Sequence, residues 1–137
     1  AARGEHELLC DAVMATASGQ RSRLCNVALG ELLATGQGDE AAAWIRWMSE
    51  TNAVRFLAQD ADLVSERLLE AVNDVQTLPS EDDARYGLRR LLKALRQTQR
   101  VAHDLPKRTP AVSRMERVES FIMNRYGQFI GVDQPLK

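Results

Sequence analysis

Apolar residues recur at intervals of three and four along most of the chain, the spacing expected for one face of an α-helix. This pattern predicts helices at about 4–17, 21–35, 39–50, 61–77, 80–105 and 110–126, with a short helical turn at 53–58. No pair of segments shows the alternation that is typical of β-strands. We therefore predict an all-α fold, a compact bundle of five to seven helices with a short extended C-terminal tail.

Polar residues at the predicted helix starts support this assignment. Ser80 stands at an N-cap position with Asp83 three residues later, and Thr109 precedes a proline at the first helical position of 110–126. Asp60 is the predicted N-cap of 61–77 and Asp39 that of 39–50. The best-marked helix is therefore 80–105, which begins after Pro79 and ends before Pro106.

The periodicity also predicts which side chains lie inside the bundle. In the helix 80–105 these are Ala84, Leu88, Leu91, Leu92, Leu95 and Ala102. In the helix 21–35 they are Leu24, Val27, Ala28, Leu32 and Leu33, and in the last helix Val112, Met115, Val118, either Phe121 or Ile122, and Met123. Phe129, Ile130 and Val132 in the tail either dock on the bundle or lead into a following domain.

Length and composition indicate one helical domain spanning 1–137, with a linker-like turn at 105–110 before the last helix. The chain begins without methionine, so we expect a segment of a larger protein. Neither a signal-peptide pattern nor an apolar run of membrane-spanning length is visible in the sequence, so we expect neither. Two cysteines are too few for a disulfide framework, which favours a reducing, cytoplasmic location.

Charge is distributed unevenly, although the formal net charge is only −1. Residues 1–80 carry 12 acidic and 6 basic side chains, whereas residues 81–137 carry 7 acidic and 12 basic ones. Five cations of the helix 80–105 fall on one stripe at its helical period, bordering the leucine face: Arg85, Arg89, Lys93, Arg96 and Arg100. Such a stripe binds a polyanion, pairs with an acidic surface such as Asp62, Glu66 and Glu70, or is simply solvated.

Other constellations give weaker signals. His6, Cys10, Cys25 and His103 would have to converge to form a zinc site, and only the first two are closely spaced. Neither a nucleophile–base signature nor a phosphate-binding loop is present. We therefore predict no catalytic residues, no bound metal and no cofactor.

Trp44 and Trp47 share one side of the helix 39–50, and tryptophans commonly anchor protein interfaces, although they are more often core. The sequence thus predicts a non-catalytic helical module for protein–protein interaction or scaffolding, with Trp44 and Trp47 as candidate contacts to an unidentified protein partner. The alternative is a domain that contacts nucleic acid through the stripe Arg85–Arg100.

Overall fold

The computed structural model of the chain describes residues 8, 10–12, 15, 20–50, 54–57, 59–103 and 109–131. These residues form five α-helices and a 3-10 helix, without a strand among them: α2 (Arg21–Ala34), α3 (Gly38–Glu50), η2 (Val54–Leu57), α4 (Asp62–Gln76), α5 (Glu81–Ala102) and α6 (Pro110–Tyr126). The predicted all-α bundle is confirmed. Most of the predicted first helix lies outside the described residues, of which 8, 10–12 and 15 are helical.

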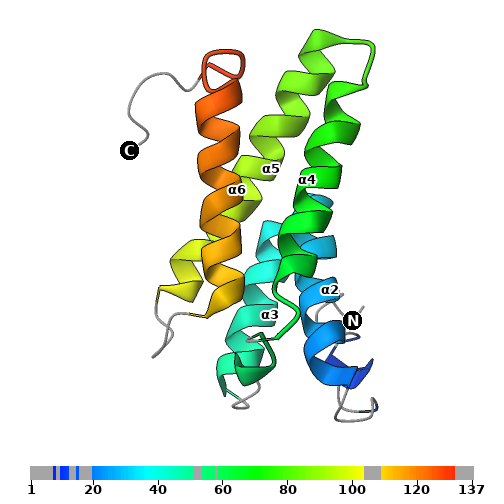
Figure 1. Cartoon of the computed structure of the whole chain (residues 1–137), viewed down its shortest axis with the longest axis vertical. Helices are drawn as coiled ribbons and strands as arrows, with labels where there is room; N and C mark the ends of the chain where they lie inside the picture. The colour runs from blue at the N-terminus through cyan, green and yellow to red at the C-terminus, as the bar shows by residue number, and fades with distance from the viewer. Residues whose placement is uncertain are drawn as a thin grey trace.

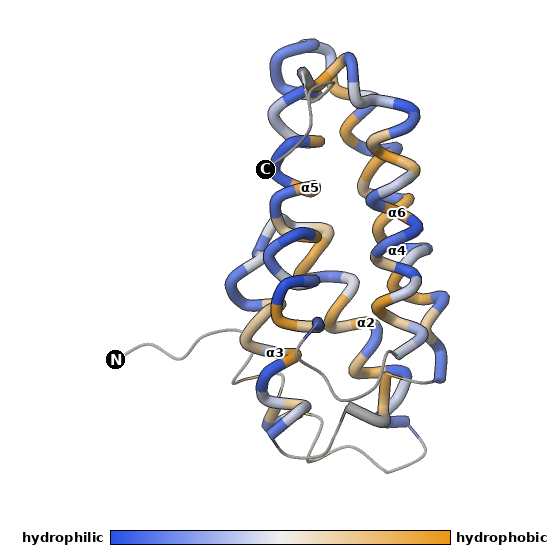
Figure 2. Tube along the Cα trace, turned by 90° about the vertical axis from the view of Figure 1, so that its left-hand side faces the viewer, coloured by the Kyte–Doolittle hydropathy of each residue, from blue (hydrophilic) through white to orange (hydrophobic). Residues whose placement is uncertain are grey.

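The helices form an elongated bundle. α4, α5 and α6 run side by side along its length, and α2 and α3 cover one half of it (Figure 1). α3 packs mainly on α5 and α2 on α4, while α6 contacts both α4 and α5. Figure 2 shows polar and apolar residues alternating along each helix, as amphipathic helices around a shared core require.

α5 follows the sequence prediction closely. Ser80 is its N-cap, and the Ser80 hydroxyl accepts a hydrogen bond from the Asp83 backbone N–H at 3.3 Å. Three acidic residues occupy the first turn, where negative charge favours the positive end of the helix dipole. All six predicted inner residues of this helix are buried.

α6 also begins as predicted, because the Thr109 hydroxyl accepts from the Val112 N–H at 3.4 Å. Of the two alternatives for its inner face, Ile122 is fully buried and Phe121 is 40% exposed. The tail differs from the prediction. Residues 127–131 form turns instead of extended chain, and the side chain of Ile130 is fully buried in the core. Val132 and the rest of the predicted tail lie outside the described residues.

Three further predictions were wrong. Asp39 is not the N-cap of α3, because the helix begins at Gly38 and Asp39 lies in its first turn. Asp60 is not an N-cap, because α4 begins after Ala61 without a side-chain cap and Asp60 adopts a left-handed φ of 58°. Aspartate tolerates this conformation better than most residues. Val27 is 43% exposed. It lies about 200° around the helix from the buried Leu29, at about 100° per residue, and therefore faces away from the core.

Asn26 joins α2 to the connection between η2 and α4. Its side chain is fully buried, and its Nδ2 group donates to the carbonyl oxygens of Ser22 (3.1 Å), Phe56 (3.4 Å) and Gln59. Buried carbonyl groups outside regular structure need such donors. One amide therefore fixes an irregular segment against the bundle.

None of the helices described in the structure combines the length and the apolar character needed to cross a bilayer.

Candidate functional site

The predicted cationic stripe on α5 begins with two arginines that bind the turn after α6. Arg85 Nε donates to the carbonyl oxygen of Phe129 at 2.8 Å, and its guanidinium lies 4.9 Å from the centre of that ring. The same side chain pairs with Asp82 at 2.9 Å. Arg89 Nε donates to the carbonyl oxygen of Ile130 at 2.7 Å. Both arginines therefore bind backbone carbonyl oxygens of the turn that follows α6 and hold this turn against α5.

The remaining three cations divide between the seam with α6 and the solvent. Arg96 Nε pairs with Glu119 Oε2 at 2.8 Å, and its Nη2 lies 3.6 Å from the sulfur of Met123. Lys93 and Arg100 are exposed. Because the stripe borders the leucine face, it lies at the edge where α6 packs. The result is a row of cations that is interrupted by internal contacts.

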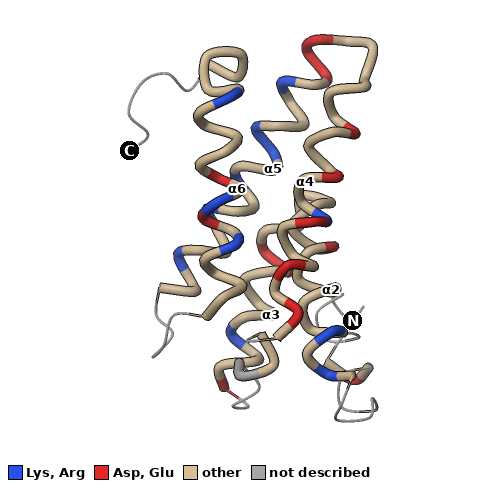
Figure 3. The backbone as a smooth tube through the Cα atoms, in the orientation of Figure 1, with Lys and Arg blue, Asp and Glu red and all other residues tan. Residues whose placement is uncertain are grey.

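The acidic residues of α4 do not pair with this stripe among the described residues. Asp62 Oδ1 lies 2.6 Å from Arg114 Nε on α6. Arg67 bridges Glu31 of α2 at 2.8 Å and Glu70 at 3.9 Å, and its hydrogen bond holds the pKa of Glu31 below the ordinary value. Figure 3 shows acidic residues at the start of α5 and along α4, with basic residues along the rest of α5. Asp62 thus links α4 to α6, and Arg67 links α4 to α2.

The two candidate tryptophans occupy different environments. Trp44 is fully buried, and its Nε1–H donates to the carbonyl oxygen of Cys25 at 3.3 Å. Trp47 is partly exposed and stacks on Trp44, with ring centroids 5.2 Å apart and planes 11° apart. In this structure Trp44 is a core residue. Only Trp47 presents surface to a partner.

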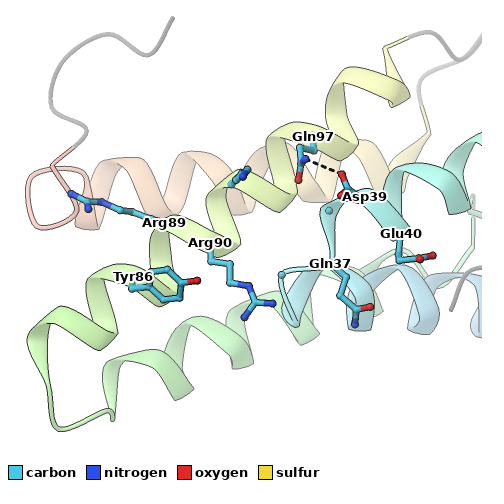
Figure 4. Close-up of a pocket in the computed structure, with 10 residues that line it drawn as sticks. Gln37, Asp39, Glu40, Tyr86, Arg89, Arg90 and Gln97 are labelled. Carbon is cyan, nitrogen blue, oxygen red and sulfur yellow. Dashed lines mark hydrogen bonds between the residues drawn. The ribbon is translucent and has the colours of Figure 1, made fainter. Parts of the chain in front are cut away.

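A groove of about 590 Å³ lies between α5 and the turn that joins α2 to α3 (Figure 4). Its volume is in the range of small-ligand and peptide-side-chain sites. Most of its lining residues are long and polar. Within the described part of the chain, the groove is lined by Gly36, Gln37, Gly38, Asp39, Glu40, Tyr86, Arg89, Arg90, Lys93 and Gln97.

Two glycines shape the floor of the groove. Gly36 has a φ of 75°, which favours glycine, and a Cβ atom there would lie only 2.5 Å from Arg90 Nε. At Gly38 a Cβ atom would lie 2.9 Å from the backbone Cα of Ala94. Glycine at both positions lets the turn pass directly beneath α5. Arg90 consequently lies over the turn, as Figure 4 shows.

The charges of the groove are separated along its length. Tyr86, which is 66% exposed, lies with Arg90 at one end, and Lys93 follows on the next turn of α5. At the other end Asp39 Oδ1 accepts a hydrogen bond from Gln97 Nε2 at 3.1 Å. The groove therefore offers both hydrogen-bond donors and carboxylate acceptors to a bound chain.

The four residues considered for a zinc site do not assemble among the described residues. Cys10 and Cys25 are buried thiols outside any disulfide, and His103 is exposed. His6 lies outside the described residues. Within the part of the chain that the structure describes, no three His, Cys, Asp or Glu side chains form a group that could hold a metal ion.

We expect the buried thiol of Cys25 to make the free energy of unfolding depend on pH in the alkaline range. Burial raises the pKa of its thiol from 9.0 to about 11, although the positive charge of Arg21 lowers it slightly. Because the folded-state pKa is the higher one, this contribution to stability is complete below pH 9 and is lost as the pH rises to 11. We expect wild type to lose on the order of 2 kcal/mol of unfolding free energy from this residue across that range.

Urea unfolding of wild type and of Cys25→Ala at pH 8 and at the upper end of this range measures the effect. The free energy of unfolding of Cys25→Ala should decline less with pH than that of wild type, whatever the stability of the variant at pH 8. Equal declines in the two proteins would contradict a raised thiol pKa.

Sequence reasoning missed most of this groove. Arg90 falls outside the stripe on the helical projection, and the sequence of Gly36, Gln37 and Gly38 indicates only that the preceding helix ends there. Only Arg89 and Lys93 belong both to the predicted stripe and to the lining of the groove. The pairing of α3 with α5 brings the turn beneath Arg90, and a helical projection of one segment carries no information about such pairing.

The fold and site define a helical bundle with a polar surface groove between two of its helices. No family model matches the chain, and comparison with curated proteins and with solved structures likewise found no match.

Proposed function

We propose that the chain is a non-catalytic helical interaction module that binds a protein partner in the groove between α5 and the α2–α3 turn. The observation that carries this proposal is the composition of the groove, where the exposed Tyr86 adjoins Arg90. Tyrosine and arginine are two of the residue types that contribute most to protein interfaces. We further propose a reducing, cytoplasmic location, which the low cysteine content of the chain supports.

The groove suits a polypeptide better than a nucleic acid. Asp39 and Glu40 line it together with the cations, and their carboxylates would repel a phosphate backbone. A polypeptide presents donors, acceptors and charges of both signs, so it can pair with both the cations and the carboxylates of the groove. Nucleic-acid binding by the stripe Arg85–Arg100 is the weaker alternative, because Arg85, Arg89 and Arg96 have contacts within the bundle.

Selection of random displayed peptides against the folded chain tests the proposal. Selected peptides should lose about tenfold in affinity for Tyr86→Ala, the loss of a moderate interface anchor. Phe121→Ala is the matched control, since Phe121 is the exposed aromatic residue of α6 and does not line the groove. Failure to select any peptide, or binding that depends on Phe121 and not on Tyr86, would contradict the proposal.

Duplex DNA titrated across a salt series tests the alternative. If the exposed Arg90, Lys93 and Arg100 each neutralised one phosphate, log affinity would fall against log salt with a slope of about −3. We expect no binding of this kind at physiological salt. A slope near −3 that falls to about −2 or less in Arg100→Glu would favour nucleic acid over protein.

A further inference from the structure

The charged side chains of the groove occupy two separate ends. Arg90 lies on the Tyr86 side, Lys93 follows one turn later on α5, and Asp39 lies where Gln97 meets the start of α3 (Figure 4). Gln97 follows Arg90 by seven positions, which corresponds to about 10 Å along the helix. An extended peptide covers this length in roughly three residues.

We infer that the groove binds a peptide segment of a protein partner that carries a carboxylate and a cation about three residues apart. The inference rests on the proposed function and specifies the chemistry of the partner. The carboxylate lies at the Arg90 end and the cation at the Asp39 end. The peptide can run in either direction, because the two ends are distinguished by charge.

Each end has the groups that this chemistry needs. At the basic end, the Arg90 guanidinium is a planar donor suited to a carboxylate, and Lys93 adds a second positive charge. The Tyr86 hydroxyl lies on the same side and can donate as well.

At the acidic end, Asp39 Oδ1 accepts one hydrogen bond from Gln97, and an ionised carboxylate has about four acceptor sites. It can therefore bind an arginine or lysine of the partner without releasing Gln97. Arg89, which lines the edge of the groove, donates from Nε to the Ile130 carbonyl.

Four synthetic peptides that differ only at two positions three residues apart test this inference. Their charged pairs are Glu and Arg, Glu and Glu, Arg and Arg, and the neutral pair Gln and Gln. Binding is followed by chemical shifts of the labelled chain at millimolar peptide. We expect the Glu/Arg peptide to bind tighter than each other peptide by about two- to fivefold per matched charge, the scale of exposed ion pairs.

Charge reversal on the protein should reverse the preference. The double variant Arg90→Glu/Lys93→Glu should bind the Arg/Arg peptide more tightly than the Glu/Arg peptide. Arg100→Glu makes the same kind of charge change at an exposed α5 position outside the groove, and it should keep the wild-type order.

The outcomes separate the inference from the proposed function. If all four peptides shift groove residues with equal affinity, or if the double variant keeps the wild-type order, the inference is overturned and the groove remains a protein-binding site. If none of the four shifts the groove at millimolar concentration, the inference is likewise overturned. A different result would contradict the proposed function itself, namely that the affinity of the displayed peptides does not depend on Tyr86.

Discussion

Trp44→Ala is expected to lower the free energy of unfolding by about 3–5 kcal/mol, the usual cost of truncating a fully buried aromatic side chain. The exposed fraction of Trp44 is 0%, and its indole N–H donates to the Cys25 carbonyl oxygen between α3 and α2. The substitution removes this bond and the stacking on Trp47, and it leaves a cavity in the core. Since small domains have about 5–15 kcal/mol of stability, much of it should be lost.

Urea unfolding followed by circular dichroism measures the change, and Trp47→Ala is the matched control. Trp47 is partly exposed, so its truncation should cost about 1–2 kcal/mol. A Trp44→Ala protein with an unchanged denaturation midpoint and weaker peptide binding would contradict the assignment of Trp44 to the core. That result would instead support the interpretation of the tryptophans as a partner-binding face.

Asn26→Asp is expected to destabilise the fold by about 3–5 kcal/mol at neutral pH, the cost of an unpaired buried charge. The Nδ2 group of Asn26 points at the carbonyl oxygens of Ser22, Phe56 and Gln59. A carboxylate oxygen in its place would repel all three. The segment between η2 and α4 would lose its attachment to α2.

The sign of the pH effect follows from the same contacts. The buried aspartate would have a folded-state pKa above its unfolded value, so its penalty grows as the pH rises through and beyond the unfolded value. The deficit relative to wild type should therefore be smaller at pH 4 than at pH 7. Asn26→Ala, which removes the donor without adding charge, should cost about 1–3 kcal/mol with little change between these pH values. Equal deficits of the aspartate variant at both pH values would show that charge is not the cause.

Much of the fold could be predicted from the sequence because its signals are local. The spacing of Leu88, Leu91, Leu92 and Leu95 specifies one face of α5, and Ser80 marks its start. The start of α6 follows from Thr109 in the same way. The prediction for Asp60 was wrong because a residue type that favours helix N-caps does not determine the backbone conformation at its position. Neighbouring residues impose that conformation. There the contacts of Asn26 with Phe56 and Gln59, far away in sequence, fix the chain.

The candidate site was less predictable for the same physical reason. Periodicity placed Arg85, Arg89 and Arg96 on one stripe, but their contacts are with α6 and the turn after it. The groove arises where α3 crosses α5, and that crossing depends on the close approach of Gly38 to Ala94. The pairing of helices is determined by the assembled core. The position of Arg90 in the groove could therefore be recognised only in the structure.

Chemical-shift mapping with a peptide selected on the folded chain tests the central claim most directly. If the groove is the binding site, the largest shifts should lie on the backbone amides of Gly36, Gln37 and Gly38 and on the α5 residues around Arg90. They should be much smaller when the same peptide is added to Tyr86→Ala at an equal concentration near the wild-type Kd, because binding there is about tenfold weaker. Shifts centred on the outer face of α6 around Phe121, with the α2–α3 turn unaffected, would contradict the proposed groove as the site where this chain binds its partner.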